Sequence, residues 1–370
     1  MGADGNAPPA VQLRGVSKHF GKVIAVHEID LDIPDGYLTT LLGPSGCGKT
    51  TILRMIAGLE KPTQGDIFIK GRRINDTPIH KRNLGMIFQN YALFPHKTIF
   101  DNVAFGLKYR NVTKADIKAK VKQALETVRL PGVEMRMPSQ LSGGQQQRIA
   151  LARAIVIEPD VLLMDEPLSA LDENLREEMR VEVSNLQEML GITSIFVTHD
   201  QREALTMSDS IVVMKDGHKQ QEGPPEEVYD TPSSHFVADF IGHSNFFKGQ
   251  IEQLDDGQVV VKLDDGHELK VAQSGDWQEG QRVEVVARAQ KFHLTPRDQP
   301  LSGAAENQFR GRIKDRSYMG GEVSYFMELQ SGIMVHAIGI AKLKPMRKGT
   351  SVRVHVAPRH CGLLKTAKQN

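Results

Sequence analysis

The stretch that decides the fold of this chain is Gly43-Pro44-Ser45-Gly46-Cys47-Gly48-Lys49-Thr50-Thr51. It matches the phosphate-binding P-loop, in which a glycine and four further residues precede Gly-Lys-Thr. Glycines let backbone N–H groups surround a phosphate chain, Lys49 can reach its outer phosphates, and Thr50 can place its hydroxyl on Mg²⁺. The run Tyr37–Leu42 before the loop favours a strand, and Thr51–Ala57 after it favours a helix. Strand, loop and helix N-terminus together predict an anion-binding site in an α/β domain.

Composition sets the limits for the rest of the chain. Its 370 residues are enough for two domains, and its formal net charge of +1 argues against nucleic-acid binding through a basic face. The two cysteines, Cys47 and Cys361, cannot form a disulfide framework and indicate a reducing compartment. Cys47 lies near a helix N-terminus, which could lower its pKa, but we favour a small filler in a tight loop. The sequence has no apolar run of about 20 residues to span a bilayer, and its N-terminus does not resemble a signal peptide.

The sequence pattern changes along the chain. Residues 1–10 are small and polar, and we expect a loose tail. From 11 to 242, strand-like and helix-like runs alternate, which predicts an α/β domain. From 243 to 370, short alternating strands take over, as where Gln258–Leu263 and His267–Val271 flank Asp264-Asp265-Gly266 in a hairpin pattern. This segment is predicted to be a separate small β-barrel domain.

A pair of acidic residues follows an apolar run in the first predicted domain. Val161–Met164 is a continuous apolar segment of the kind found in strands buried on both faces, and Asp165 and Glu166 follow it. Asp165 can hold Mg²⁺ through water, and Glu166 can polarise the water that attacks a terminal phosphate. Because a P-loop precedes the pair, we expect a nucleotide hydrolase.

A third motif is Leu141-Ser142-Gly143-Gly144-Gln145, which starts a helical run. Ser142 is a favourable N-cap, and the two glycines permit close backbone approach. The motif therefore predicts a second helix start that can accept an anion.

The three motifs, in this order, resemble the nucleotide-binding subunit of ATP-binding cassette (ABC) transporters. Four smaller family marks support the resemblance. Phe20 matches the aromatic residue that stacks on adenine, Gln89 matches the Q-loop glutamine, Asp172 matches the D-loop, and His199 matches the switch histidine. The implied fold is an α/β P-loop NTPase with a helical subdomain at about 90–157, followed by a small all-β OB-like (TOBE) domain.

The resemblance also implies roles for these residues. Two cassettes face head to tail, and each ATP lies between the P-loop of one and the motif at 141–145 of the other. Glu166 is expected to be the base, His199 to contact the γ-phosphate, Asp172 to bridge the dimer, and Gln89 to link Mg²⁺ and water to the membrane-facing surface. The expected ATP contacts are Phe20, Gly43, Pro44, Ser45, Gly46, Cys47, Gly48, Lys49, Thr50, Thr51 and Gln89. The expected contacts with the second ATP are Leu141, Ser142, Gly143, Gly144 and Gln145. The expected Mg²⁺ ligands are Thr50, Gln89 and Asp165.

One cassette followed by a β-rich domain resembles importer ATPases that carry a TOBE domain. Membership implies a second copy of the chain, two transmembrane permease subunits, a solute-binding protein that acts through the permease, and a peripheral location on the cytoplasmic face of the cell inner membrane. A soluble ABC ATPase is the alternative from another class. The β-domain is expected mainly to dimerise the subunits, with a regulatory sensor as the alternative.

The transported solute is less strongly indicated. Three stretches, Met86–His96, Leu190–Asp200 and Ala204–Asp209, resemble the polyamine (spermidine/putrescine) branch more than the sugar branch. Ferric-iron and phosphonate or opine importers are the next alternatives. The TOBE region commonly carries Arg-Pro-Glu where this chain has Arg288-Ala289-Gln290, so the regulatory contact of the usual glutamate is in doubt.

Overall fold

The structure, a computed structural model, describes residues 8–110, 112–255, 257–272, 275–297, 307–341 and 345–366. It consists of two compact units, Met1–Val228 and Tyr229–Asn370. The second unit begins within helix α7 (Pro225–Asp230), earlier in the chain than the predicted boundary after Gly242. The reason is that α8 (His235–Ile241) packs Ala238 into an apolar cluster with residues of the β-rich unit.

The predicted loose tail covers residues 1–10, of which 1–7 lie outside the described residues. Ala10 is fully buried at 0% exposure. Its N–H donates to the carbonyl of Ile33 at 2.8 Å, and its own carbonyl accepts from the Lys70 N–H at 2.8 Å. Ala10, which directly precedes the first strand at Val11, is therefore held by hydrogen bonds on both sides and is not part of a loose tail.

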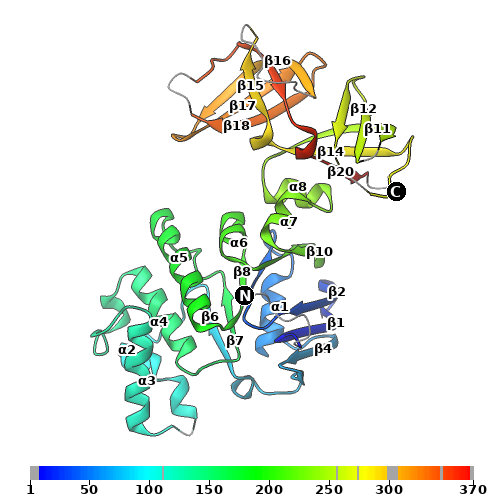
Figure 1. The fold of residues 1–370 in the computed structure, drawn as a ribbon. Helices are drawn as coiled ribbons and strands as arrows, with labels where there is room; N and C mark the ends of the chain where they lie inside the picture. Colours follow the sequence, from blue (N-terminus) through cyan, green and yellow to red (C-terminus); the bar gives the residue numbers. More distant parts are fainter. Residues whose placement is uncertain are drawn as a thin grey trace. The chain divides into compact units, whose positions relative to one another are not determined.

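A six-stranded sheet forms the centre of the first unit, in the order β10-β9-β3-β8-β7-β6 (Figure 1). The strands are β3 (Leu38–Leu42), β6 (Leu84–Ile87), β7 (Val161–Asp165), β8 (Thr193–Thr198), β9 (Ser210–Lys215) and β10 (His218–Gly223). All neighbours pair in parallel except β9 and β10. Every residue of β3, β7 and β8 is buried, as expected for apolar runs covered on both faces. The carboxyl ends of these three strands lead into the P-loop, Glu166 and His199.

A smaller antiparallel sheet has the order β2-β1-β4-β5. Its strands are β1 (Val11–Phe20), β2 (Val23–Ile33), β4 (Gln64–Ile69) and β5 (Arg72–Arg73). Helix α1 (Lys49–Ala57) contributes Ile52, Leu53 and Met55 to an apolar core that also contains residues of both sheets. This packing fixes the helix that follows the P-loop.

The remaining helices of the first unit share a second apolar core. They are α2 (Ile99–Val103), α3 (Lys114–Thr127), α4 (Gly143–Ile155), α5 (Glu173–Leu190) and α6 (Gln201–Met207). Ile99, Leu125 and Ile149 bring α2, α3 and α4 together in this core. These three helices lie together in the segment where a helical subdomain was expected, beside the sheet (Figure 1).

The second unit contains two five-stranded antiparallel sheets. One has the order β13-β12-β11-β14-β20, formed by β11 (Ser244–Asp255), β12 (Gln258–Leu263), β13 (Glu268–Val271), β14 (Arg282–Arg288) and β20 (Cys361–Lys365). The other has the order β15-β19-β16-β17-β18, formed by β15 (His293–Pro296), β16 (Gln308–Tyr318), β17 (Glu322–Leu329), β18 (Met334–Ile340) and β19 (Ser351–His355). The predicted hairpin is confirmed, with Val261 opposite Leu269.

The two predicted fold classes, α/β followed by all-β, are therefore confirmed. Residues of both five-stranded sheets share one apolar core, which includes Phe247, Val285, Phe309 and Val354. Beyond Ile241, the described residues form only strands and short 3₁₀ turns, among them η4 (Ala289–Lys291) and η5 (Pro358–His360). No helix in the described part of the chain is long and apolar enough to cross a membrane.

Candidate nucleotide-binding and active site

The P-loop connects β3 to α1 and is packed closely against neighbouring backbone. A Cβ on Gly43 would lie 2.3 Å from the carbonyl oxygen of Met214, and one on Gly48 would lie 2.6 Å from the carbonyl oxygen of Ala25. Gly48 also has φ of 101°, which L side chains rarely adopt. Glycine is therefore required at both positions, as the P-loop pattern predicts.

Lys49 is buried at the start of α1, with 4% exposure. Its ammonium donates to the carbonyl oxygens of Gly43 at 2.7 Å and Pro44 at 2.9 Å. The charge of this lysine is thus held inside the loop, where a phosphate chain would approach. Burial raises the pKa of the nearby Cys47 thiol, although the charge of Lys49 acts to lower it. Cys47 therefore fits the description of a small filler better than that of a reactive thiol.

Thr50 and Asp165 meet where α1 begins and β7 ends. The Thr50 hydroxyl donates to Asp165 Oδ1 at 2.9 Å. Burial raises the pKa of Asp165, and the hydrogen bond from Thr50 partly opposes this effect. A hydroxyl and a carboxylate are oxygen ligands of the type that Mg²⁺ prefers.

The described residues contain no group of three or more His, Cys, Asp or Glu side chains that could hold a metal ion. Mg²⁺ commonly binds one or two carboxylates together with waters and substrate phosphates, so a complete protein cage is not required. Thr50 and Asp165 therefore fit an ion that arrives with a nucleotide.

Glu166 has a left-handed backbone, with φ of 45°. Such a conformation costs of order 1–3 kcal/mol in a non-glycine residue and persists only where its surroundings impose it. Here the Glu166 N–H donates to the Val197 carbonyl at 3.0 Å, and the Ser169 hydroxyl donates to the Glu166 carbonyl at 2.9 Å. The backbone is thus fixed on both sides, which aims the carboxylate.

The Glu166 carboxylate contacts two of the predicted site residues. His199 Nδ1 lies 3.3 Å from Glu166 Oε1, and Gln89 Nε2 lies 3.4 Å from Glu166 Oε2. Gln89 Nε2 also lies 3.4 Å from the Ser169 hydroxyl. Residues that are far apart in sequence thus meet at one carboxylate. The Glu166 side chain is 20% exposed. Water can therefore reach Glu166 between an amide and an imidazole.

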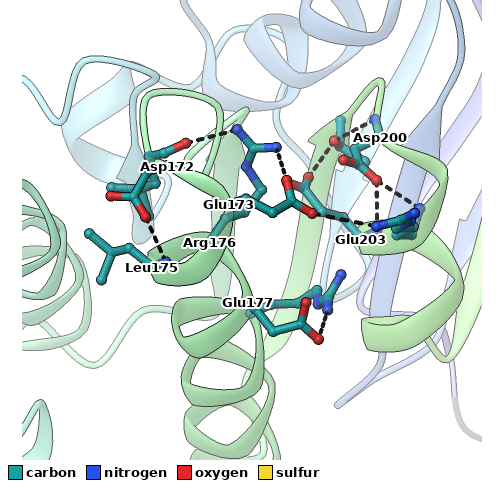
Figure 2. A network of polar contacts seen from close by, with 11 residues as sticks. Asp172, Glu173, Leu175, Arg176, Glu177, Asp200 and Glu203 are labelled. Atoms are coloured by element: carbon teal, nitrogen blue, oxygen red, sulfur yellow. Dashed lines mark hydrogen bonds and ion pairs between the residues drawn. The ribbon is translucent and has the colours of Figure 1, made fainter. Parts of the chain in front are cut away.

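Asp172 caps helix α5, because its Oδ1 accepts from the Leu175 N–H at 3.0 Å (Figure 2). The Arg176 guanidinium donates to the Leu171 carbonyl at 2.8 Å and to Glu173 at 3.3 Å. These contacts hold the start of the helix. The role of Asp172 across a dimer stays a prediction.

Glu173 also reaches helix α6, where the Arg202 guanidinium lies 3.4 Å from its carboxylate. In α6, Asp200 Oδ1 accepts from the Arg202 N–H at 2.7 Å and from the Glu203 N–H at 3.2 Å. The Glu203 carboxylate is buried at 4% exposure and accepts a hydrogen bond from the Thr198 hydroxyl. Burial raises the pKa of Glu203. Sequence reasoning missed Glu173 and Glu203, although Asp200 followed by Glu203 is a recognisable helix-start pattern.

The motif at 141–145 starts helix α4 as predicted. The Gln145 N–H donates to the Ser142 hydroxyl at 3.4 Å, while the Ser142 N–H donates to the Gln145 side chain at 3.0 Å. A Cβ on Gly144 would lie 3.0 Å from Leu175 Cδ1, which explains a glycine at this position. Gly143 has more room, since its nearest neighbour would lie at 3.8 Å.

Phe20 ends strand β1 and is 47% exposed. The Lys18 ammonium lies 4.6 Å from the centre of its ring. An aromatic ring with one free face is available for stacking on a base, so the position fits the adenine contact that was expected.

Comparison with known proteins agrees with this geometry. The ABC transporter family model matches residues 26–169, and the TOBE domain model matches residues 287–364. The spermidine/putrescine import ATP-binding protein PotA of Rubrobacter xylanophilus is 43% identical over 361 residues, covering 96% of this chain and 94% of its own length. The chain belongs to the import ATP-binding proteins of ABC transporters. It is therefore an ATPase of that family.

Other relatives of this ABC ATPase carry different solute names. PotA of Trichormus variabilis is 45% identical over 333 residues, covering 90% of this chain and 87% of its own length. The Fe(3+) ions import ATP-binding protein FbpC 1 of Rhizobium meliloti is 44% identical over 328 residues, covering 89% of this chain and 90% of its own length.

Two solved structures resemble the cassette of this ABC ATPase. CbiO1 from Clostridium perfringens, part of the ABC transporter complex cbiONQ, has a TM-score of 0.56 and 29% identity, covering 60% of this chain and 90% of its own. The dimeric bacterial ABC transporter cassette MJ0796 has a TM-score of 0.52 and 32% identity, covering 58% of this chain and 98% of its own.

Arg288-Ala289-Gln290 lies near the start of the segment that matches the TOBE domain, residues 287–364. The buried Arg288 guanidinium donates to the carbonyls of Tyr229 and Ala238 and, at 2.8 Å, to the Ser244 hydroxyl. It also lies over the Tyr229 ring, 4.3 Å from the ring centre. Arg288 thus joins the helical start of the second unit to its sheet. Gln290 is exposed, with Oε1 3.4 Å from the Tyr229 hydroxyl, so the glutamine makes a neutral contact where a glutamate would place a charge.

Proposed function

We propose that this ABC ATPase powers the uptake of a polyamine such as spermidine or putrescine through a membrane permease. The observation that carries the ATPase part is the convergence of Gln89 and His199 on the Glu166 carboxylate, beside the Thr50–Asp165 pair. The polyamine part is supported by relatives named PotA that align with nearly the whole chain.

In the proposed mechanism, the P-loop glycines and Lys49 hold the phosphates, and Phe20 stacks on the adenine. Thr50 and Asp165, with Gln89, would hold Mg²⁺, and the ion would supply positive charge to neutralise the phosphates. Glu166 accepts a proton from the attacking water, and His199 orients the terminal phosphate. Removing a general base typically costs about 10² to 10⁴ in rate.

We propose that two copies of the chain act together, head to tail. The helix start at Ser142 presents backbone N–H groups and two glycines, a suitable partner for phosphate bound to the P-loop of the second copy. A dimeric cassette among the similar solved structures supports this arrangement.

The permease contact belongs to the same proposal. Among the large apolar side chains of the first unit that are exposed are Phe88 (36%), Tyr109 (77%) and Met135 (82%). Phe88 directly precedes Gln89. A permease helix that contacts Phe88 would therefore be coupled through Gln89 to the proposed Mg²⁺ site. A solute-binding protein would act through the permease, and the ATPase would lie on the cytoplasmic face of the inner membrane.

Uptake in cells that carry the intact transporter tests this function. Labelled spermidine, putrescine and ferric iron are compared in wild type and Glu166→Gln. We expect polyamine uptake that is lost in the variant. Iron uptake with the same dependence would favour the second candidate, which the FbpC 1 relative supports. If uptake of none of the three solutes depends on Glu166, the proposed substrate is wrong.

A further inference from the structure

The second unit contains a cavity of about 410 Å³ beside η4, η5 and β20. This is within the range of volumes that hold small molecules in proteins. Part of its wall is apolar and comes from Pro232, Val286 and Leu364. The cavity is lined by residues of the second unit alone, whereas the P-loop and Glu166 belong to the first unit, and the proposed ATPase mechanism does not use it.

Several cationic side chains also line the cavity. Lys291, Arg359 and His360 come from η4 and η5, and Asp230 is the single carboxylate among the described residues that line the wall. Arg288 also lines it, but this guanidinium is engaged with the carbonyls of the helical segment before β11. Two free cations therefore face one carboxylate.

The two cations have few partners. The Lys291 ammonium makes no hydrogen bond or ion pair with any residue that the structure describes. Arg359 Nε donates to His360 Nε2 at 3.4 Å, a contact with a neutral ring and not with an acid. Most of the Arg359 guanidinium donors thus remain available for a ligand.

His360 lies among more basic than acidic groups. The pKa of His360 is lowered, first by burial and then by the charges of Lys291, Arg359 and His293, while Asp230 acts to raise it. One carboxylate does not cancel the charge of the basic groups around it.

We propose that this cavity binds a small organic anion. Its phosphate or carboxylate group would lie between Lys291 and Arg359, because these donors suit both groups and are not otherwise paired. Its apolar part would contact Val286 and Leu364. An inorganic anion would leave this apolar wall without a contact. We therefore expect an organic phosphate to bind more tightly than inorganic phosphate.

Calorimetric titration of the full chain tests the site. The probes are phenyl phosphate, benzoate and inorganic phosphate, with sodium chloride at equal ionic strength as the control. Phenyl phosphate and benzoate share one apolar ring, so their comparison identifies which anionic group is preferred. We expect saturable binding of at least one organic anion, with a dissociation constant at least tenfold higher in Lys291→Ala and in Arg359→Ala. The matched control is Arg310→Ala, an exposed arginine of β16 outside the cavity.

The P-loop could bind phosphate as well, so each probe is also titrated against Lys49→Ala. Binding that survives Lys49→Ala and is lost in Lys291→Ala belongs to the second-unit cavity. Binding that is lost in Lys49→Ala and survives in Lys291→Ala contradicts the proposal, as does the absence of saturable binding in wild type. This outcome is separate from the ATPase role of Glu166, since neither cavity residue lies in that site.

The pH dependence gives a second measurement. An anion favours the protonated form of His360, which Lys291, Arg359, His293 and Asp230 face. We therefore expect the organic anion to bind the cavity more tightly at pH 6 than at pH 8. The same rise should be absent in His360→Gln, and its persistence there would contradict a role for this histidine.

Discussion

His199 Nδ1 lies 3.3 Å from Glu166 Oε1, although the two residues follow different strands of the central sheet. The contact exists because β7 and β8 are parallel neighbours, so their carboxyl ends meet at one edge. Glu166 adopts a left-handed backbone at this edge, which is costly for a glutamate and is held by hydrogen bonds on both sides. The backbone therefore positions the Glu166 carboxylate before a nucleotide binds.

The Thr50–Asp165 pair predicts how the ATPase uses Mg²⁺. We expect Asp165→Asn to reduce hydrolysis by about 10² or more, because electrostatic stabilisation of the reacting phosphate is a large contribution to catalysis. Thr50→Ser keeps the hydroxyl and should keep most activity, whereas Thr50→Ala should require more Mg²⁺ for half-maximal rate. Phosphate release measured against Mg²⁺ concentration checks this, and an unchanged Mg²⁺ requirement in Thr50→Ala would exclude the hydroxyl as a ligand.

Two P-loop glycines provide a matched pair. Gly48→Ala meets the Ala25 carbonyl and has φ of 101°, while Gly46→Ala has φ of 80° with no atom within 4 Å. Backbone strain of order 1–3 kcal/mol is expected in both variants, and only Gly48→Ala must also displace neighbouring backbone. Urea unfolding should show the larger loss of stability in Gly48→Ala. Equal losses would mean that the close approach to Ala25 is not a constraint.

Burial of Glu203 predicts a pH-dependent stability. The folded-state pKa of Glu203 is raised, so its stabilising contribution is complete below the unfolded pKa and is lost as pH rises through the folded pKa. Glu203→Gln has no charge to bury and can still accept from Thr198. We expect its free energy of unfolding to rise relative to wild type as the pH rises above the ordinary glutamate pKa of about 4.3. A constant difference over this range would mean that Glu203 has an ordinary pKa.

The two cysteines should react slowly while the protein is folded. Burial raises the pKa of Cys361 to about 12 and also raises that of Cys47, so the reactive thiolate form is scarce near neutral pH. Labelling with a thiol-specific chromogenic reagent at pH 7.5 should be slow for both and rapid after unfolding in urea. Rapid labelling of Cys47 in the folded protein would restore the reactive-thiol alternative.

Much of the fold and of the site arrangement follows from local sequence. The P-loop fixes the strand, turn and helix at 38–57, because glycine conformation and the anion-binding helix start are local properties. The buried strand before Asp165 and the N-cap at Ser142 are equally local. Strand alternation was enough to predict the all-β character of the second unit.

Other features depend on tertiary contacts and could not be predicted from the sequence. The backbone of Glu166 is left-handed only because Val197 and Ser169 hold it. Residues 229–242 have helical and loop patterns that match the first unit, yet the Arg288 guanidinium ties them to the second. Ala10 ends a stretch whose composition is typical of a loose tail, but its N–H donates a hydrogen bond to the Ile33 carbonyl.

The measurement that tests the central claim most directly is ATP binding and phosphate release by the purified chain, in wild type and in Glu166→Gln. Glu177→Gln, an α5 variant that lies away from the predicted catalytic carboxylate, is the control. Loss of the base should slow release by about 10² to 10⁴, which corresponds to roughly 3–5 kcal/mol of barrier, while ATP binding is retained. Phosphate release at the wild-type rate in Glu166→Gln would contradict the assignment of Glu166 as the general base.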